Sequence, residues 1–385
     1  MYYPPVLSII NVLLELKYRV VHIGNYTDKE QKKQLEERGA IFKSTIKLDD
    51  NVSLLKKLAM KLEFKRQVTS YLEIETISKE DYVWLFHTET LCLLNDLVDR
   101  YRVVFHPLEF TQPVASWKYK VLTPSLNLAA TVKKTAKVVC CEYNRAQITK
   151  GMFALEQMPY VLPNKMYMAN DELTDIPEDV QDLVNPILSK VEGKKIILYQ
   201  GVFLDKERRL EEFCEAVKEM SDEYVLIAMG KGSSYYESLK DKYQSEKILF
   251  IPFIRPPYHL LVTKAASIGV LSYFPDSTSI SSVINPLYCA PNKIFEYARY
   301  GTPMISNDIP GLYYIFMQYE CGEVVRHPMT TTGIKATIEK IYTDYDKYAS
   351  GALRYYRSVD IEEIIKSVLS CLLYTSPSPR DGLLS

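Results

Sequence analysis

Lys293 and Glu296 lie three residues apart at the start of a predicted helix within residues 290–306, APNKIFEYARYGTPMIS. Pro291 suits a first helical turn, because its missing N–H costs little there. Free N–H groups and the positive end of the helix dipole favour an anion at such a start. A carboxylate one turn further along is placed to accept hydrogen bonds from a vicinal diol such as a ribose. The pattern predicts a nucleotide-sugar site, with Asn292 and Lys293 at the diphosphate and Glu296 at the ribose.

The end of this segment predicts how the helix stops. Gly301 is expected to cap the helix in the left-handed conformation, and Pro303 prevents its continuation. A short apolar strand is expected from Met304. The alternative interpretation of the whole segment is an ordinary capped helix of an α/β protein.

The segment resembles the donor-site motif of retaining glycosyltransferases of the family 4 type. The usual motif is Pro-Asn-Lys-x-Phe-Glu-Tyr, followed by a small-residue stretch and Gly-x-Pro. The resemblance implies an α/β fold of two Rossmann-like domains that face a cleft, the GT-B fold. One position departs from the family, which often has a second Glu where this chain has Tyr288. This difference leaves the donor sugar and the activity open. A subset of polysaccharide-building relatives has a similar loop, which indicates that the loss of this Glu is tolerable.

The resemblance implies further donor-binding residues in the second half of the chain. Gly201 follows a strand at the point where the family's backbone approaches the donor phosphates. Arg208 is the first candidate for the basic residue that neutralises the diphosphate, because Arg209 takes a position often held by glycine. Gly230 and Gly232 follow the next strand and would line the donor pocket, with a plain turn as the alternative.

The resemblance also implies site residues in the first half. His106 ends a predicted strand and is expected to meet the donor sugar as a catalytic residue, with Glu109 three residues later. Open α/β sheets place ligands at the carboxyl ends of their strands. Expected acceptor-side contacts at such ends are His87, Glu89, Glu142 and Arg145. The alternative for each is an ordinary surface loop residue, and His259 is expected to be structural.

Composition limits the other classes of function. The 385 residues carry a net charge of −1, so nothing indicates nucleic-acid binding. No run of about 20 apolar residues predicts a membrane span. The seven Cys form no CxxC pair, so neither a metal site nor a disulfide framework is expected, and a reducing cytoplasm is favoured. The resemblance implies no cofactor and no metal, and it weakly favours UDP over GDP in the donor.

Strand and helix patterns alternate along the chain and predict parallel sheets with crossover helices. The expected parts are an acceptor-side domain (1–165), a linker with a short helix (166–192), a nucleotide-sugar domain (193–355), a terminal helix (356–370) and a tail (371–385). The tail contains CLLYTSPSPRD, which matches a translated sequencing adapter, so it is expected to be non-native. The first strand of a Rossmann-like domain is missing before the helix at 6–16, so Met1 is expected to be internal to a longer protein.

Residues 54–66 form a basic amphipathic stretch that could rest on an anionic membrane surface, with a solvated helix face as the alternative. The favoured function is sugar transfer to a cell-surface glycan or its lipid-linked precursor in a bacterial cytoplasm, at the inner face of the membrane. The alternatives are a non-catalytic nucleotide-binding scaffold, a sugar-nucleotide epimerase and an inactive fragment of a transferase.

Overall fold

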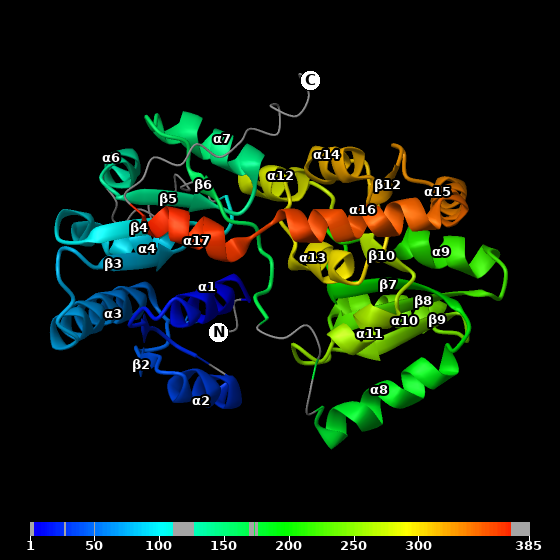
Figure 1. The fold of residues 1–385 in the computed structure, drawn as a ribbon, viewed down its shortest axis with the longest axis horizontal. Coiled ribbons are helices and arrows are strands. Elements are labelled where there is room, and N and C mark those ends of the chain that lie inside the picture. The colour runs from blue at the N-terminus through cyan, green and yellow to red at the C-terminus, as the bar shows by residue number, and fades with distance from the viewer. Residues whose placement is uncertain are drawn as a thin grey trace. The chain divides into compact units, whose positions relative to one another are not determined.

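The structure is a computed structural model that describes residues 4–26, 28–49, 51–110, 127–168, 173 and 176–370. The chain forms two compact units (Figure 1): unit 1 comprises Met1–Pro163 and Asp360–Ser385, and unit 2 comprises Asn164–Val359. The division after Pro163 lies near the expected boundary at 165. The last helix belongs to unit 1, although the sequence suggests only a terminal helix after the second domain. The expected non-native tail, 371–385, lies outside the described residues.

Unit 2 is built on one parallel sheet of six strands, in the order β12-β11-β10-β7-β8-β9. Its strands are apolar and almost fully buried, as expected for a parallel sheet that is covered on both faces. The chain reverses its direction of winding between the neighbouring strands β7 and β10, and ligands bind beyond the carboxyl ends of strands at such a switch point. The strands are β7 (Lys195–Val202), β8 (Tyr224–Lys231), β9 (Ile248–Pro252), β10 (Ile268–Leu271), β11 (Met304–Asn307) and β12 (Gly322–Val325).

Helices cover both faces of this sheet, and an apolar cluster lies under each set. They are α8 (Glu178–Lys190), α9 (Glu211–Glu219), α10 (Ser234–Tyr243), α11 (Leu260–Ala265), α12 (Ile280–Leu287), α13 (Asn292–Arg299), α14 (Pro310–Tyr319), α15 (Thr331–Thr343) and α16 (Tyr345–Ser358). Helix α8 occupies much of the expected linker, and its buried Val180 and Val184 join the core of unit 2.

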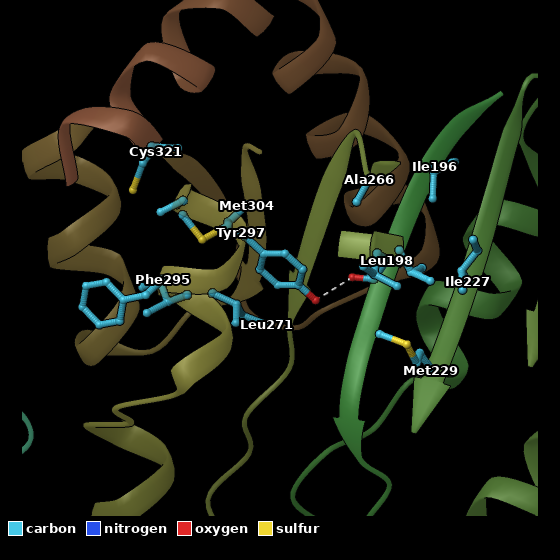
Figure 2. Packing of buried hydrophobic residues seen from close by; sticks show 14 of the residues in the cluster. Ile196, Leu198, Ile227, Met229, Ala266, Leu271, Phe295, Tyr297, Met304 and Cys321 are labelled. Carbon is cyan, nitrogen blue, oxygen red and sulfur yellow. Dashed lines mark hydrogen bonds between the residues drawn. The ribbon is translucent and has the colours of Figure 1, made fainter. Parts of the chain in front are cut away.

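Helix α13 is fixed to the sheet by Tyr297, which is fully buried. Its hydroxyl donates a 2.9 Å hydrogen bond to the carbonyl of Leu198 on β7 (Figure 2). The ring lies over Gly269 of β10, where an added Cβ would come within 2.4 Å of it. The absence of a side chain at Gly269 therefore sets how closely α13 approaches the sheet.

One boundary in unit 2 differs from the expectation. Pro291 is the extended residue before α13 and not part of its first turn, with φ −75° and ψ 139°. Helix α12 precedes this segment, where Ser279 caps its start and Pro286 removes only one hydrogen bond near its end. Helix α9 begins at Glu211, so Arg208 and Arg209 lie in the loop after β7. Gly301 has φ +66°, as its capping role requires.

The described part of unit 1 contains two parallel sheets, β1-β2 and β3-β4-β5-β6. Their strands are β1 (Val21–Ile23), β2 (Ile41–Lys43), β3 (Tyr82–Phe86), β4 (Arg102–His106), β5 (Lys137–Cys140) and β6 (Tyr160–Val161). The helices are α1 (Pro4–Glu15), α2 (Lys29–Glu37), α3 (Leu54–Ile74), α4 (Thr88–Leu93), η1 (Asn95–Asp99), α6 (Leu128–Lys133), α7 (Tyr143–Phe153) and α17 (Ile361–Leu369). The segment between β3 and β4 thus forms two short helices, α4 and η1.

Candidate functional site

The first turn of α13 carries an unpaired cation. The Nζ atom of Lys293 lies 4.4 Å from the ring centre of Tyr199 and 5.3 Å from that of Tyr273. Among the described residues, it makes no hydrogen bond and no ion pair, so these two rings are its principal support. Burial, and then the nearby charge of Arg208, lower the pKa of Lys293 to about 7. An anion brought to this point would be the missing partner of the ammonium group.

Arg208 supplies a second cation beside Lys293. Its guanidinium lies 4.0 Å from the ring centre of Tyr273, the ring that Lys293 also faces. Its closest acidic neighbour is Glu207, at 3.7 Å. Tyr273 is buried and follows β10, and the side-chain amide of Asn307 bonds to both its N–H (2.9 Å) and its carbonyl. The loop after β7 and helix α13 therefore bring two cations to the ring of Tyr273, which follows β10.

Arg209 points elsewhere. Its guanidinium lies 4.1 Å from the ring centre of Phe274 and 3.3 Å from a carboxylate oxygen of Glu212. The structure thus brings only the first of the two predicted arginines to Lys293.

The three predicted glycines have different surroundings. Gly201 is the next-to-last residue of β7 and has φ +137°, and a Cβ there would lie 3.0 Å from Nζ of Lys293. It therefore belongs to the surroundings of the cations. Gly230 packs against β7, since an added Cβ would come within 2.0 Å of the carbonyl oxygen of Gly201. A Cβ at Gly232 would meet only the side chains of Glu237 and Tyr236. Of the three, Gly201 alone lies beside Lys293.

Glu296 lies one turn after Lys293, and both of its carboxylate oxygens have partners. The side-chain amide of Gln200 on β7 donates to Oε2 at 2.5 Å, and Nε2 of His259 lies 3.3 Å from Oε1. Burial acts to raise the pKa of this carboxyl. The attraction and hydrogen bond of His259, the hydrogen bond of Gln200 and the charge of Lys293 outweigh burial, so the pKa lies below its usual value. Glu296 is therefore ionised at neutral pH.

Sequence reasoning missed three residues of this arrangement. His259, expected to be structural, contacts Glu296, and Gln200 lies between Glu296 and Thr263. Tyr273 joins the two cations. The position of Gln200 directly before Gly201 was the one local signal available, since residues at that strand end face the switch point.

In unit 1, the predicted catalytic residue His106 is fully buried at the end of β4. Its Nε2 lies 3.5 Å from the sulfur of Cys141, and its Nδ1 has no hydrogen-bond partner among the described residues. Burial, and then the neighbouring His87, lower the pKa of His106 to about 3, so its imidazole is neutral at pH 7.

Two predicted strand-end carboxylates, Glu89 and Glu109, lie near His87. This residue precedes α4 with φ +66° and ψ 144°, a conformation that costs a residue with a side chain about 1–3 kcal/mol. Burial lowers the pKa of His87, whereas the charges of Glu89 and Glu109, both exposed, raise it. The predicted acidic residues Glu89 and Glu109 therefore lie near one histidine of the pair.

Glu142 and Arg145 organise the backbone. A carboxylate oxygen of Glu142 accepts a 2.9 Å hydrogen bond from the N–H of Arg145 and caps α7. Burial raises the pKa of Glu142, although hydrogen bonds from Asn144 and Arg145 act in the opposite direction. The guanidinium of Arg145 donates to the carbonyl of Leu108 at 3.2 Å. Their side chains are thus engaged in holding the loops after β4 and β5.

The helix α3 carries exposed apolar side chains among cations. Leu55 is 81% exposed and Leu62 is 58% exposed, and Lys56 and Arg66 are exposed beside them. No helix in the described ranges is long and apolar enough to span a membrane. Nor do any three His, Cys, Asp or Glu side chains in those ranges gather as a metal site.

No protein-family model and no curated protein match the sequence, but solved structures match its fold along nearly the whole chain. HepE of Anabaena, in complex with UDP-glucose, has a TM-score of 0.66 with 13% identity over 96% of this chain and 95% of its own. WaaG, a glycosyltransferase involved in lipopolysaccharide biosynthesis, has a TM-score of 0.61 with 12% identity over 96% of both chains. A UDP-N-acetylglucosamine 2-epimerase has a TM-score of 0.60 with 12% identity over 95% of this chain and 91% of its own. The chain thus has the mixed α/β fold of the GT-B glycosyltransferases, with parallel sheets.

Proposed function

We propose that this protein is a glycosyltransferase that uses a nucleoside-diphosphate sugar and retains the configuration of the transferred sugar. The observation that carries the proposal is the pairing of Lys293 and Glu296 on successive turns at the start of α13, beyond the switch point of a Rossmann-like sheet. Lys293 has no ion pair within the described ranges, and Glu296 is ionised, so the two groups suit a diphosphate and a ribose diol respectively.

In the proposed reaction, Lys293, Arg208 and the N–H groups of the first turn of α13, at Asn292, hold the diphosphate. Their positive charge stabilises the negative charge that develops when the sugar–phosphate bond breaks. The bond breaks to give an oxocarbenium-like sugar, the acceptor hydroxyl attacks from the side of the leaving group, and the departing phosphate takes its proton. The two side-chain cations supply the neutralisation, so the proposed reaction needs no metal and no cofactor. UDP is the favoured leaving group, in keeping with the UDP-glucose held by the HepE structure.

The sugar and acceptor side of the reaction is proposed for unit 1. His106 would hydrogen-bond to the sugar as a neutral imidazole, because burial keeps it uncharged. Glu109 would orient it or the acceptor, and His87, Glu89, Glu142 and Arg145 would complete the acceptor side. The acceptor is a cell-surface glycan or its lipid-linked precursor, and α3 would hold the protein at the anionic inner face of a bacterial membrane.

The test is thermal unfolding with UDP, GDP, ADP and NAD, for the wild type and for Glu296→Ala, followed by product analysis with a UDP-sugar. A nucleotide at about 100 times its Kd stabilises the native protein by about 2.7 kcal/mol. We expect one nucleoside diphosphate to stabilise the protein. We expect Glu296→Ala to weaken the affinity for that nucleotide about tenfold to several hundredfold. The matched control is Glu219→Ala, which removes an exposed carboxylate that pairs with Lys335.

The outcomes separate the alternatives. Binding without transfer or donor hydrolysis would identify a non-catalytic scaffold, for which Tyr288 at the position of the family's second Glu is the specific observation. Conversion of the donor into its epimer would identify an epimerase. If Glu296→Ala weakened nucleotide binding by less than about twofold, Glu296 would not be part of the binding site.

A further inference from the structure

Glu296 is held by side chains from two other elements of unit 2. Gln200 comes from the end of β7 and binds Oε2, and His259 directly precedes α11 and binds Oε1. The side chains of Glu296 and His259 are each 11% exposed, and Gln200 is 4% exposed. The carboxylate of Glu296 therefore cannot turn about its Cγ–Cδ bond without breaking its interaction with Gln200 or with His259.

The amide of Gln200 has its own fixed orientation. The hydroxyl of Thr263, fully buried on α11, donates a 2.7 Å hydrogen bond to Oε1 of Gln200. The amide oxygen is thereby kept at Thr263, and the amide NH₂ is kept toward Glu296. The reversed amide would place its oxygen against a carboxylate oxygen, which is repulsive. Thr263 therefore acts on Glu296 through Gln200.

The two protein donors leave part of the carboxylate available. An ionised carboxylate offers about four acceptor positions, and Gln200 and His259 occupy one on each oxygen. One position on each oxygen remains for a ligand, with the plane of the carboxylate already set. Two acceptors in a fixed plane suit two neighbouring hydroxyl groups better than one.

We propose that Gln200, Thr263 and His259 are positioning residues, which hold the carboxylate of Glu296 ready for both hydroxyls of a ribose. The inference rests on the proposed function, because it concerns the same nucleotide site. It makes the site selective for a ribonucleotide over its 2′-deoxy form. The rival explanation is that these polar groups pair only to avoid the cost of burial, which would affect stability but not this selectivity.

The experiment measures the Kd of UDP and of 2′-deoxy-UDP for the wild type, Thr263→Val, Thr263→Ser and Glu296→Ala by calorimetry. Thr263→Val removes the hydroxyl that fixes the amide, and Thr263→Ser keeps it. Thr263→Val is expected to weaken UDP binding about threefold to tenfold. The same change should weaken 2′-deoxy-UDP binding less than twofold, and Thr263→Ser should restore the wild-type value for UDP. A double variant with Glu296→Ala should show no further loss.

Thr302→Val is the matched control for folding. Thr302 is a buried threonine of unit 2 whose hydroxyl bonds to the carbonyl of Ala266, away from Glu296. Thr302→Val is expected to lower the thermal midpoint, as Thr263→Val does. It is expected to leave the ratio of the Kd values for UDP and 2′-deoxy-UDP unchanged.

The inference and the proposed function fail differently. An equal loss of UDP and 2′-deoxy-UDP in Thr263→Val, or no rescue by serine, would overturn the positioning role while leaving the nucleotide site in place. Failure of the wild type to bind UDP, GDP or ADP would overturn the proposed function and, with it, this inference.

Discussion

Unit 1 and unit 2 both place polar side chains at the carboxyl ends of parallel strands, but they partner these side chains differently. In unit 2, Lys293 faces two aromatic rings without an ion pair among the described residues. In unit 1, Arg145 donates to the carbonyl of Leu108, and Glu142 caps α7. A partly buried cation without an anion is costly to keep, whereas a cation on a backbone carbonyl supports the fold.

The two units also differ in the backbone beside their predicted site residues. In unit 2, the positive-φ residues next to Lys293 and at the end of α13 are glycines, Gly201 and Gly301. Unit 1 places His87 and Leu108 in positive φ at the ends of β3 and β4, which is strained for residues with side chains. The difference teaches that the candidate site of unit 2 carries its energetic cost in an unpaired charge, whereas unit 1 carries its cost in the backbone.

The largest expected effect compares the two cations. Lys293→Met should weaken UDP binding about tenfold to a hundredfold, because charge-assisted hydrogen bonds contribute about 1.5–3 kcal/mol each. The same change should raise the free energy of unfolding by about 1–2 kcal/mol at neutral pH, because it removes a cation that lacks an anion. Arg145→Met should instead lower that free energy by about 1–3 kcal/mol and leave the Kd of UDP unchanged. Calorimetry measures the Kd of UDP, and urea unfolding measures the free energy of unfolding. If Lys293→Met destabilised the protein as Arg145→Met does, the two cations would not differ in the way described.

A pH experiment sharpens the same contrast. Because the pKa of Lys293 is about 7 in the folded protein against 10.5 ordinarily, the unfolded chain binds more protons between these values. The contribution of Lys293 to stability is therefore least favourable below pH 7 and improves as pH rises through that window. A bound diphosphate should restore the proton, so binding at about pH 8.5 should take up about one proton per UDP.

Proton uptake is measured by calorimetry in two buffers of different ionisation enthalpy. Lys293→Met is the control and should lose most of the uptake. Equal apparent enthalpies in both buffers for the wild type would show that Lys293 is already charged in the free protein.

A smaller effect is expected for the strained residue of unit 1. At position 87, glycine should be more stable than alanine by about 1–2 kcal/mol, because alanine keeps a Cβ at positive φ. Urea unfolding of His87→Gly and His87→Ala tests this, and sugar transfer should fall in both variants if His87 serves the acceptor. Equal stability of the two variants would show that the turn relaxes freely.

The smallest expected effect concerns the surface of α3. The double variant Leu55→Ser with Leu62→Ser should weaken binding to vesicles that contain anionic lipid about threefold to fivefold, without a change in thermal midpoint. Met317→Ser on α14, at a residue 63% exposed in unit 2, is the matched control and should bind vesicles as the wild type does. Equal binding by all three proteins would favour the solvated-face interpretation of residues 54–66.

The sequence predicted most strands and the end of α13, because Gly301 and Pro303 act locally on the chain. It did not predict α12, because the capping residue Ser279 lies outside the motif. The site was predictable where its residues are neighbours, as Lys293 and Glu296 are. Gln200, His259 and Tyr273 are at least 19 positions before α13 in the sequence, and only the winding of the sheet brings them to this helix.

The close contact between Gly269 and the ring of Tyr297 has a consequence for genetics. Gly269→Ala would force α13 away from the sheet and shift Lys293 and Glu296 together, although residue 269 touches neither. Such a change should lower the stability of the protein, and so its activity, more strongly as temperature rises. It weakens the packing of α13 against the sheet, although Lys293 and Glu296 are still present in the helix. A cell that depends on this protein would then carry a temperature-sensitive allele in which residues 290–306 are unchanged.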